Sequence, residues 1–175
     1  MGYGNEMKTK PIVQVVICSD RASSGTYEDK SGPAASRWLV DNGFISRDVI
    51  VIPDSSEMLT EIIQTSILVD NDFIVISGGT GISPTDITPQ TLDEICEYSV
   101  PGFGEMLRRE SIKYSLNAYL SRCGAWVLKR KLIFALPGNP KAVVEQLEII
   151  KDLLPHALDA VQGVCKHRRP VETHD

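Results

Sequence analysis

Cysteine and histidine are scarce in this chain of 175 residues, and neither forms a ligand pattern. No C-x-x-C pair occurs, and three of the four cysteines lie in apolar surroundings that are typical of small buried residues. The three histidines lie near the C-terminus without a thiol or carboxylate at ligand spacing, so no zinc site is expected. This usage favours a reducing cytosol and a cytoplasmic protein. The cysteines are Cys18, Cys96, Cys123 and Cys165.

The sequence also lacks long apolar runs and an excess of positive charge. No segment approaches the roughly 18 apolar residues that a membrane span requires, so no membrane partner is expected. The first ten residues are polar and glycine-rich, unlike a signal peptide. The net charge is −5 and the basic run KHRRP is confined to 166–170, which argues against binding to nucleic acid.

The composition that is present is that of a globular protein. Hydrophobic residues make up 42% and charged residues 23%, and no tract resembles a linker between two folding units. We predict a flexible N-terminal arm at 1–10, a single domain at 11–165 and a polar tail at 166–175.

Strand-like and helix-like segments alternate along this domain. Such alternation predicts an open, mostly parallel α/β sheet with helices on both faces, in which ligands bind outside the carboxyl ends of the strands. β-branched runs predict strands at 12–18, 44–52 and 72–77 and two strands within 125–136. Apolar spacing and start signals predict helices at 34–43, 55–71 and 103–116 and from Thr88 and Pro140.

A glycine-rich segment, SGGTG at 77–81, follows one of the predicted strands. Its glycines allow close approach of a ligand and positive φ angles, so that successive N–H groups can point into one concavity. Ser77 and Thr80 add hydroxyl donors, and this combination is typical of a phosphate site. The alternative is a tight turn that needs glycine only for its geometry. The segment matches neither a P-loop nor a dinucleotide-binding motif, so an NTPase or a dehydrogenase is not supported.

Two aspartates are expected near this segment. Asp86 follows the glycines and Asp54 ends a neighbouring strand, so both carboxylates can face one crevice and hold Mg²⁺ together with phosphate oxygens. Each has a structural alternative, Asp54 as a turn or helix-entry residue and Asp86 as the cap of the helix near Thr88. Asp20 is a third acid at this edge, for which we expect a turn role.

The segment PGNP at 137–140 is a candidate for a second anchoring turn. Gly138 allows close backbone approach, Asn139 is suited to cap a helix and Pro140 to begin it. The N–H groups at the start of that helix could bind an anion. A simple connection between strand and helix is the alternative.

Several of these motifs together resemble one known family. They are VICSDRASSGTYEDKSGP, VIPD, SGGTGISPTDITPQTLDEI, PGFGEMLRRES, LSR and LPGNPKAVVEQL, in that order along nearly the whole chain. The sequence is similar to the MogA/MoaB-like molybdopterin-binding domains, which include the G domain of gephyrin. The resemblance implies a three-layer α/β/α sandwich, often a homotrimer.

The resemblance also implies a molybdopterin adenylyltransferase, which transfers AMP from MgATP to the terminal phosphate of molybdopterin and releases pyrophosphate. The product would pass to a molybdenum insertase. Asp54 and Asp86 match the two functional aspartates, with a catalytic role and as ligands of Mg²⁺. The matching substrate-binding positions are Ser77, Gly78, Gly79, Thr80, Gly81, Ser121, Arg122, Pro137, Gly138, Asn139 and Pro140.

One residue departs from the family pattern. Many relatives have an arginine immediately before the second aspartate, where this chain has Thr85. The cation would then be missing or supplied by Arg21, Arg122 or Lys141. A non-catalytic, MoaB-like molybdopterin-binding or assembly module is therefore an alternative. A phospho-acceptor receiver is a third, which the glycines after the strand at 72–77 disfavour.

Overall fold

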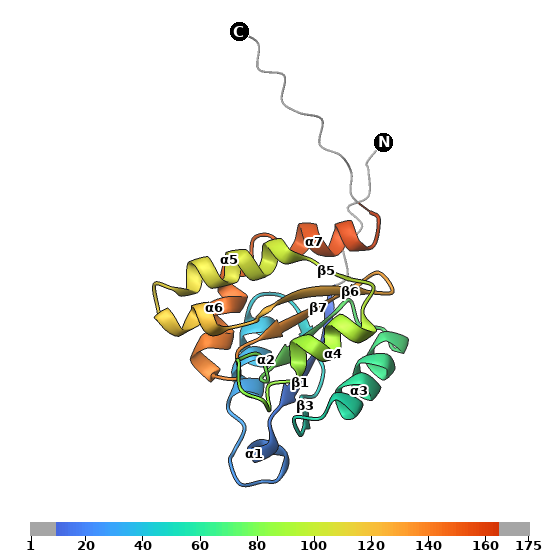
Figure 1. The fold of residues 1–175 in the computed structure, drawn as a ribbon. Helices are drawn as coiled ribbons and strands as arrows, with labels where there is room; N and C mark the ends of the chain where they lie inside the picture. The colour runs from blue at the N-terminus through green and yellow to red at the C-terminus, as the bar shows by residue number, and fades with distance from the viewer. Residues whose placement is uncertain (1–9, 165–175) are drawn as a thin grey trace, which may run out of the picture.

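The computed structural model of the protein describes residues 10–164. The predicted tail at 166–175 and the predicted arm at 1–10, except for Lys10, lie outside the described residues. Within 10–164, one sheet is covered by helices on both faces (Figure 1). No helix in this range combines the length and the apolar character needed to cross a membrane.

The sheet has the strand order β2-β1-β4-β7-β6-β5. Strand β3 also pairs with β1, at the end of β1 that β2 does not reach. The pairs β2–β1, β3–β1, β1–β4 and β4–β7 are parallel, whereas β7–β6 and β6–β5 are antiparallel. The mostly parallel sheet that the sequence predicts is therefore confirmed. The strands are β1 Ile12–Cys18, β2 Ile45–Ser46, β3 Ile50–Ile52, β4 Phe73–Ser77, β5 Tyr98–Ser99, β6 Gly124–Leu128 and β7 Lys131–Leu136.

The helices form two outer layers, which completes the predicted three-layer sandwich. Buried side chains of α2, α5, α6 and α7 pack on one face of the sheet, and those of α3 and α4 pack on the other. The helices are α1 Asp20–Ser23, α2 Ser31–Asp41, α3 Ser56–Leu68, α4 Thr88–Ile95, α5 Pro101–Ser111, α6 Pro140–Ile150 and α7 Leu154–Val161, with a 3₁₀ helix η1 at Leu116–Leu120.

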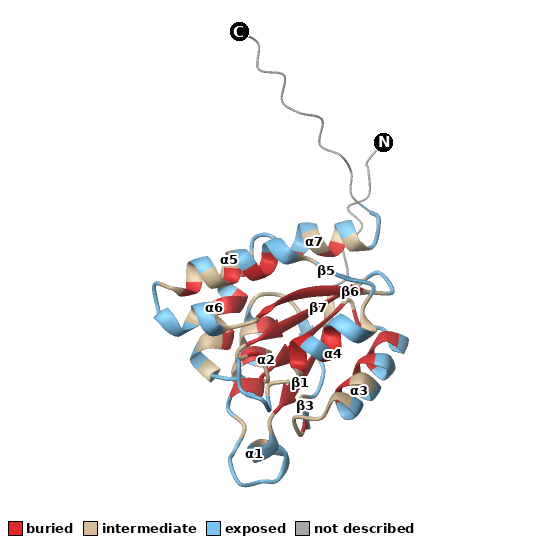
Figure 2. Cartoon of the chain, in the orientation of Figure 1, coloured by how far each residue is buried: buried red, intermediate tan, exposed pale blue. Residues whose placement is uncertain are grey.

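Alternation of side chains along the central strands supplies both cores. In β4, Phe73 and Val75 belong to the core under α2 and α6, whereas Ile74 and Ile76 belong to the core under α3 and α4. All four are fully buried, because successive strand residues point to opposite faces and both faces are covered. Figure 2 shows the resulting buried sheet between helices whose outer sides are exposed.

The helices predicted at 34–43 and 55–71 are found at Ser31–Asp41 and Ser56–Leu68, and two other predicted elements differ for reasons that their hydrogen bonds show. The strand predicted at 44–52 is interrupted between β2 and β3, where the Arg47 side chain donates to the Asn71 side chain (2.6 Å) and to the Asp70 carbonyl (2.9 Å). The helix predicted at 103–116 is displaced to Pro101–Ser111, because Pro101 begins α5 and the chain tightens after Ser111, where the Tyr114 N–H bonds to the Ser111 carbonyl three residues back.

Candidate active site

A cavity of about 770 Å³ opens at the carboxyl ends of β1, β3, β4 and β7. It lies where an open parallel sheet is expected to bind its ligand. All the predicted site residues line it except Arg122. Its walls are the segment after β1, the loop after β4, the α5–η1 region and the start of α6.

The backbone of the loop after β4 turns sharply at two glycines. Gly78 has a φ of +110° and Gly79 a φ of +62°, angles that other L-residues rarely adopt. A Cβ atom on Gly78 would collide with the Cys18 carbonyl oxygen, and one on Gly79 would lie 2.5 Å from Thr88 Oγ1. Thr88 fixes the turn, since its hydroxyl donates to the Gly78 carbonyl (2.9 Å) and its N–H to the Gly79 carbonyl (3.0 Å).

The same turn leaves several backbone donors unused. The Gly78 N–H donates to the Leu136 carbonyl (3.0 Å), but the N–H groups of the next three residues, 79–81, make no hydrogen bond to any part of the described chain. They lie on the wall of the cavity. Consecutive free N–H groups in a glycine-rich turn form an anion-binding concavity.

Asp54 and Asp20 are held together by reciprocal hydrogen bonds. The Asp20 N–H donates to the Asp54 carboxylate (3.0 Å), and the Asp54 N–H donates to the Asp20 carboxylate (3.0 Å). Burial raises the pKa of Asp54, the bond from Asp20 N–H opposes this, and the charges of Asp20 and Asp86 raise it further. The ionised Asp54 carboxylate is therefore destabilised by its burial and by two neighbouring acids.

Asp86 closes a turn of its own loop and does not cap α4. Its Oδ2 accepts from the Ser83 N–H (2.8 Å), whereas α4 begins after Ile87 without a side-chain cap. The capping role of Asp86 that the sequence left open is therefore wrong. Asp54 directly precedes Ser55, which caps α3, so its position agrees with the turn or helix-entry role that the sequence left open. Both aspartates have a carboxylate oxygen near the glycine loop, Oδ1 of Asp54 and Oδ2 of Asp86, the second of which also accepts the bond from Ser83.

The two carboxylates fit a magnesium ion held together with phosphate. Within residues 10–164, no group of three or more His, Cys, Asp or Glu side chains could hold a metal ion by itself. Mg²⁺ commonly takes one or two carboxylates and completes its shell with phosphate oxygens and water. Asp54 Oδ1 lies 3.4 Å from where a Cβ on Gly79 would be, and Asp86 Oδ2 lies 2.7 Å from where one on Gly81 would be. A cation there would also offset the repulsion that raises the pKa of Asp54.

Arg122 supports the loop from behind instead of lining the cavity. Its Nε donates to the Gly81 carbonyl (2.7 Å) and its Nη2 to the Asp86 carbonyl (2.8 Å). Its own N–H donates to the Thr80 carbonyl (2.8 Å). The guanidinium is therefore used to orient the loop, and its neighbour Ser121 lines the cavity.

The turn at 137–140 approaches the glycine loop closely, and the first N–H groups of the helix that follows it are occupied. A Cβ atom on Gly138 would lie 3.2 Å from Gly78 Cα, and Ser77 Oγ donates to the Pro137 carbonyl (2.8 Å). The Asn139 side chain accepts from the N–H groups of Lys141 (2.9 Å) and Ala142 (3.2 Å). The cap predicted at Asn139 is present, but it occupies the N–H groups that were expected to bind an anion.

Basic side chains reach the cavity from two other segments. Arg21 and Lys30 come from the segment after β1, and Lys141 comes from α6. Thr85 does not line the cavity, and its hydroxyl shares a hydrogen bond with Ser83 Oγ (3.1 Å). Of the three predicted substitutes for a cation at position 85, Arg21 and Lys141 line the cavity and Arg122 does not.

Cys18 also lines the cavity but is unsuited to act as a nucleophile. It is buried, and burial raises its pKa to about 12, with the charge of Asp54 adding to the effect. Thiolates, and not thiols, attack electrophiles. The thiol of Cys18 is therefore not expected to react with a ligand of the cavity.

Sequence reasoning missed the wall formed by α5, η1 and Gln146. Gln146 faces the core side of α6 with Val143, Leu147 and Ile150. A polar residue within such an apolar stripe was a detectable signal. The segment around η1 carried no comparable signal, because its residues are exposed or half-buried and lack a regular pattern.

The sequence of the cavity-forming domain matches a known family. Residues 14–156 match the family described as "Probable molybdopterin binding domain". The chain belongs to the MogA/MoaB family of molybdopterin-binding domains. The resemblance drawn from the motifs is thereby confirmed, and the MogA/MoaB fold agrees with the α/β/α layers in Figure 1.

Relatives within the MogA/MoaB family have two different names. The molybdopterin adenylyltransferase of Helicobacter pylori (strain 26695) is 35% identical over 154 residues, which cover 86% of this chain and 88% of the relative. A solved structure of the molybdopterin biosynthesis enzyme MoaB from Thermus thermophilus is 33% identical, with a TM-score of 0.81 over 87% of this chain and 96% of that one.

A third relative is a longer protein. The molybdenum cofactor biosynthesis bifunctional protein of Synechococcus elongatus (strain PCC 7942) is 34% identical over 149 residues, which cover 85% of this chain. The match covers 47% of that protein, so this chain spans about half of its length.

Proposed function

We propose that this protein is a molybdopterin adenylyltransferase in molybdenum cofactor biosynthesis. It would transfer AMP from MgATP to the terminal phosphate of molybdopterin and release pyrophosphate. The observation that carries the proposal is the row of free N–H groups at 79–81, bordered by the carboxylates of Asp54 and Asp86. The name of the Helicobacter relative supports the same reaction.

The proposed reaction needs no strong base. An oxygen of the already ionised terminal phosphate of molybdopterin attacks the α-phosphorus of ATP. A new P–O bond forms, the bond from that phosphorus to the α–β bridging oxygen breaks, and pyrophosphate leaves with the electron pair. Positioning and charge stabilisation therefore supply the rate enhancement.

The residues of the cavity divide this work between them. The N–H groups at 79–81 and the hydroxyl of Thr80 bind phosphate oxygens, and Arg122 keeps them oriented through the Gly81 carbonyl. Asp54 and Asp86 would hold Mg²⁺, which when bound offsets the negative charge that collects on the leaving pyrophosphate. Lys30 and Lys141 place positive charge at the wall of the same cavity.

Release of pyrophosphate tests this proposal directly. Purified protein with molybdopterin, ATP and Mg²⁺ should produce pyrophosphate and adenylylated molybdopterin. Asp86→Asn should lower the rate at least about 100-fold, because it removes one of the two carboxylates that would hold Mg²⁺, and the cation is what offsets the negative charge on the leaving pyrophosphate. Asn keeps an oxygen that can accept from the Ser83 N–H, so the fold should be unchanged. Asp41→Asn on the exposed side of α2 is the matched control. Equal rates for Asp86→Asn and the control would refute the role of Asp86.

A MoaB-like protein that binds molybdopterin without turnover is the second candidate. Thr85 favours it, because no arginine stands beside Asp86 and Thr85 itself does not line the cavity. The 33% identity to the Thermus MoaB also fits this candidate. Tight binding of molybdopterin with no pyrophosphate released under saturating MgATP would establish it and exclude the first.

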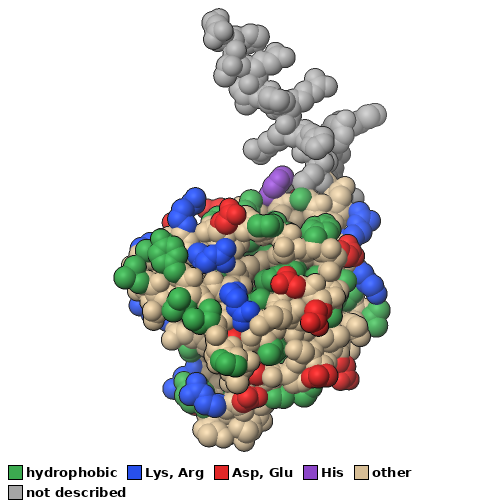
Figure 3. All heavy atoms as spheres, viewed as in Figure 1, with side chains coloured by type: hydrophobic (Ala, Val, Ile, Leu, Met, Phe, Trp, Pro, Cys, Tyr) green, Lys and Arg blue, Asp and Glu red, His purple; other side chains and the backbone are tan. Residues whose placement is uncertain are grey.

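The homotrimer and the transfer of product to a molybdenum insertase stay predictions. Exposed hydrophobic side chains gather near the end of α5 and at η1, at the left edge of Figure 3. They include Tyr114, Leu116, Tyr119 and Leu120. Light scattering on the purified chain would measure the mass of the assembly, and a mass of one chain would exclude the trimer.

A further inference from the structure

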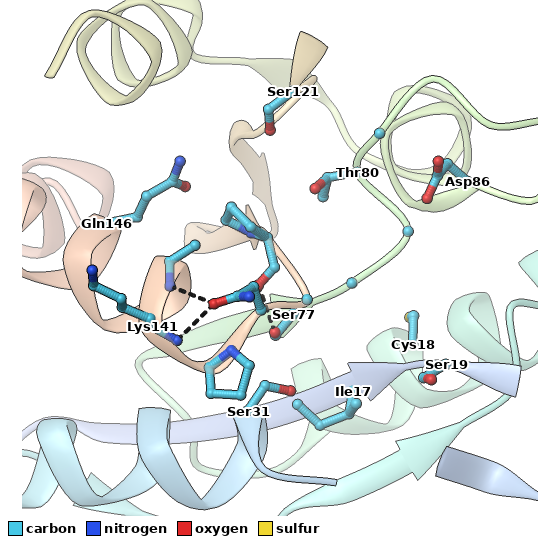
Figure 4. Close-up of a pocket in the computed structure, with 18 of the residues that line it drawn as sticks. Ile17, Cys18, Ser19, Ser31, Ser77, Thr80, Asp86, Ser121, Lys141 and Gln146 are labelled. Atoms are coloured by element: carbon cyan, nitrogen blue, oxygen red, sulfur yellow. Dashed lines mark hydrogen bonds between the residues drawn. The ribbon is translucent and has the colours of Figure 1, made fainter. Parts of the chain in front are cut away.

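Gln146 is a buried amide in the wall of the cavity with one end unpartnered. Its side chain extends from α6 toward the space that Ser121 and Thr80 face from the other side (Figure 4). The residue is 2% exposed. Its Nε2 donates to Ser111 Oγ (3.3 Å) and lies 3.6 Å from Cys123 Sγ. Among the buried side-chain nitrogen and oxygen atoms of residues 10–164, only its Oε1 has no hydrogen-bond partner.

The unpartnered end does not depend on which way the amide is oriented. Exchanging the oxygen and the nitrogen would let Ser111 Oγ donate to the oxygen, but it would then leave the NH₂ group where Oε1 is now. In both orientations one polar end lacks a partner, and in the orientation that the structure has this end is the acceptor Oε1. A buried polar group without a partner costs about 1–3 kcal/mol, so such groups normally bond to protein, water or ligand.

The position of Gln146 separates it from the charged part of the cavity. Figure 4 shows Asp86 on the far side of the glycine loop from Gln146, with Thr80 and Ser121 between them. The neighbours that bond to Gln146, Ser111 and Cys123, are uncharged. A phosphate is therefore favoured at the loop, and a neutral polar group is favoured at Gln146.

We propose that Gln146 determines specificity by hydrogen-bonding an N–H group on the heterocycle of a substrate. The inference rests on the proposed function, in which both substrates carry such a ring: the pterin of molybdopterin and the adenine of ATP. The terminal torsion of Gln is broad, so Oε1 can turn toward a ligand in the cavity that Gln146 lines. A site with a buried acceptor discriminates against analogues that lack the donor.

Binding measurements with isolated parts of the substrates test this inference. The variants are Gln146→Met, which has a similar volume and no amide, and Gln64→Met, the same change on the exposed side of α3. The probes are pterin, adenosine and inorganic pyrophosphate, titrated by calorimetry against the full chain. Gln146→Met should weaken one heterocycle about tenfold or more, since loss of one buried hydrogen bond costs about 1–3 kcal/mol. Pyrophosphate should bind equally to all three proteins.

The pattern of losses identifies the ring. A selective loss for pterin assigns Gln146 to molybdopterin, and a selective loss for adenosine assigns it to ATP; both support the inference. Unchanged affinity for both rings overturns it and assigns the amide to a buried water. An equal loss for all three probes also overturns it, because only a structural role would weaken pyrophosphate binding. If neither ring binds to the unaltered protein, the inference is likewise overturned.

The readout is separate from that of adenylyl transfer. If the protein binds a ring through Gln146 but releases no pyrophosphate, the proposed reaction fails and the assignment of Gln146 stands. If pyrophosphate is released at equal rates and with equal KM values by Gln146→Met and Gln64→Met, the reaction stands and the assignment fails.

Discussion

Two strand-to-helix turns meet at the cavity, and they differ in how far side chains occupy their backbone N–H groups. The loop after β4, at 78–81, leaves its N–H groups at 79–81 free. The turn after β7, at 137–140, has its helix N–H groups occupied by the Asn139 side chain. Both contain glycine and lie within van der Waals distance of each other.

The difference shows that a glycine turn before a helix is not by itself an anion site. What decides is whether a side chain of the turn already satisfies the N–H groups. At the start of α6 a good N-cap does so, which stabilises the helix and leaves only the N–H groups of residues 138 and 139 without a hydrogen bond to the described chain. At 78–81 Thr88 bonds to carbonyls and not to N–H groups, so the donors stay available. We infer that the first turn binds the phosphate and the second supports it.

Among the substitutions that test this comparison, Gly79→Ala should have the largest effect on the rate. Alanine at a φ of +62° is strained by about 1–3 kcal/mol, and its Cβ would lie 2.5 Å from Thr88 Oγ1. The backbone would shift and misplace the free donors. Since removal of one oriented donor costs about 10²–10³ in kcat, we expect pyrophosphate release to fall about 100-fold. Gly102→Ala is the control, because a Cβ there meets nothing within 4 Å. Equal rates in both variants would place the phosphate elsewhere.

A smaller loss is expected from Arg122→Lys. The guanidinium bonds to two carbonyls, of Gly81 and Asp86, whereas a lysine keeps the charge but cannot reproduce that planar pair of bonds. We expect kcat to fall about tenfold, equivalent to roughly 1.4 kcal/mol of transition-state stabilisation. Arg109→Lys, at an exposed position on α5, is the control. Full activity in Arg122→Lys would mean that charge alone matters, as in direct contact with phosphate.

Features that depend on residues close together in the sequence were predicted, and features that depend on residues far apart in the sequence were not. The central strands, the glycine loop and the Asn139 cap were predicted, because β-branched runs, glycines and caps act within a few residues. Arg122 was assigned to the ligand instead of the loop, since its partners lie 36 and 41 residues away in the chain. The break between β2 and β3 has a similar origin. Arg47 bonds to Asp70 and Asn71, which lie in the distant connection between α3 and β4.

Asn139→Ala tests the difference between the two turns through the stability of the protein and not through its reaction rate. Loss of the cap leaves two helix N–H groups without a partner, so we expect the free energy of unfolding to fall by about 1 kcal/mol. Affinity for pyrophosphate should change less than about threefold, because the phosphate site is the other turn. Urea denaturation and calorimetry measure the two quantities. Asn139→Ser, which can still cap, should be near the unaltered protein in both. A tenfold or larger loss of pyrophosphate affinity in Asn139→Ala would give both turns the same role.

The smallest expected effect is a gain in stability of the ligand-free protein in Asp54→Asn. Burial and the charges of Asp20 and Asp86 raise the pKa of Asp54, so its ionised form opposes folding. In acid, where the carboxyl is protonated in the folded and unfolded chains, the two proteins should melt alike. As the pH rises past the ordinary pKa of an aspartate, the unaltered protein loses stability relative to the variant, and the difference is complete above the raised pKa.

Because Asp54 is only partly buried and solvent screens it, we expect a rise in Tm of about 1–3 °C at neutral pH. Melting curves from about pH 3 to about pH 8 measure it, with Asp41→Asn as the exposed control. The same substitution should abolish stabilisation by Mg²⁺ with pyrophosphate, since the repulsion that destabilises the empty cavity is the feature that a cation would relieve. An offset in Tm that is independent of pH would show instead that the new amide side chain acts through packing, and the carboxylates would then have no electrostatic conflict for a cation to resolve.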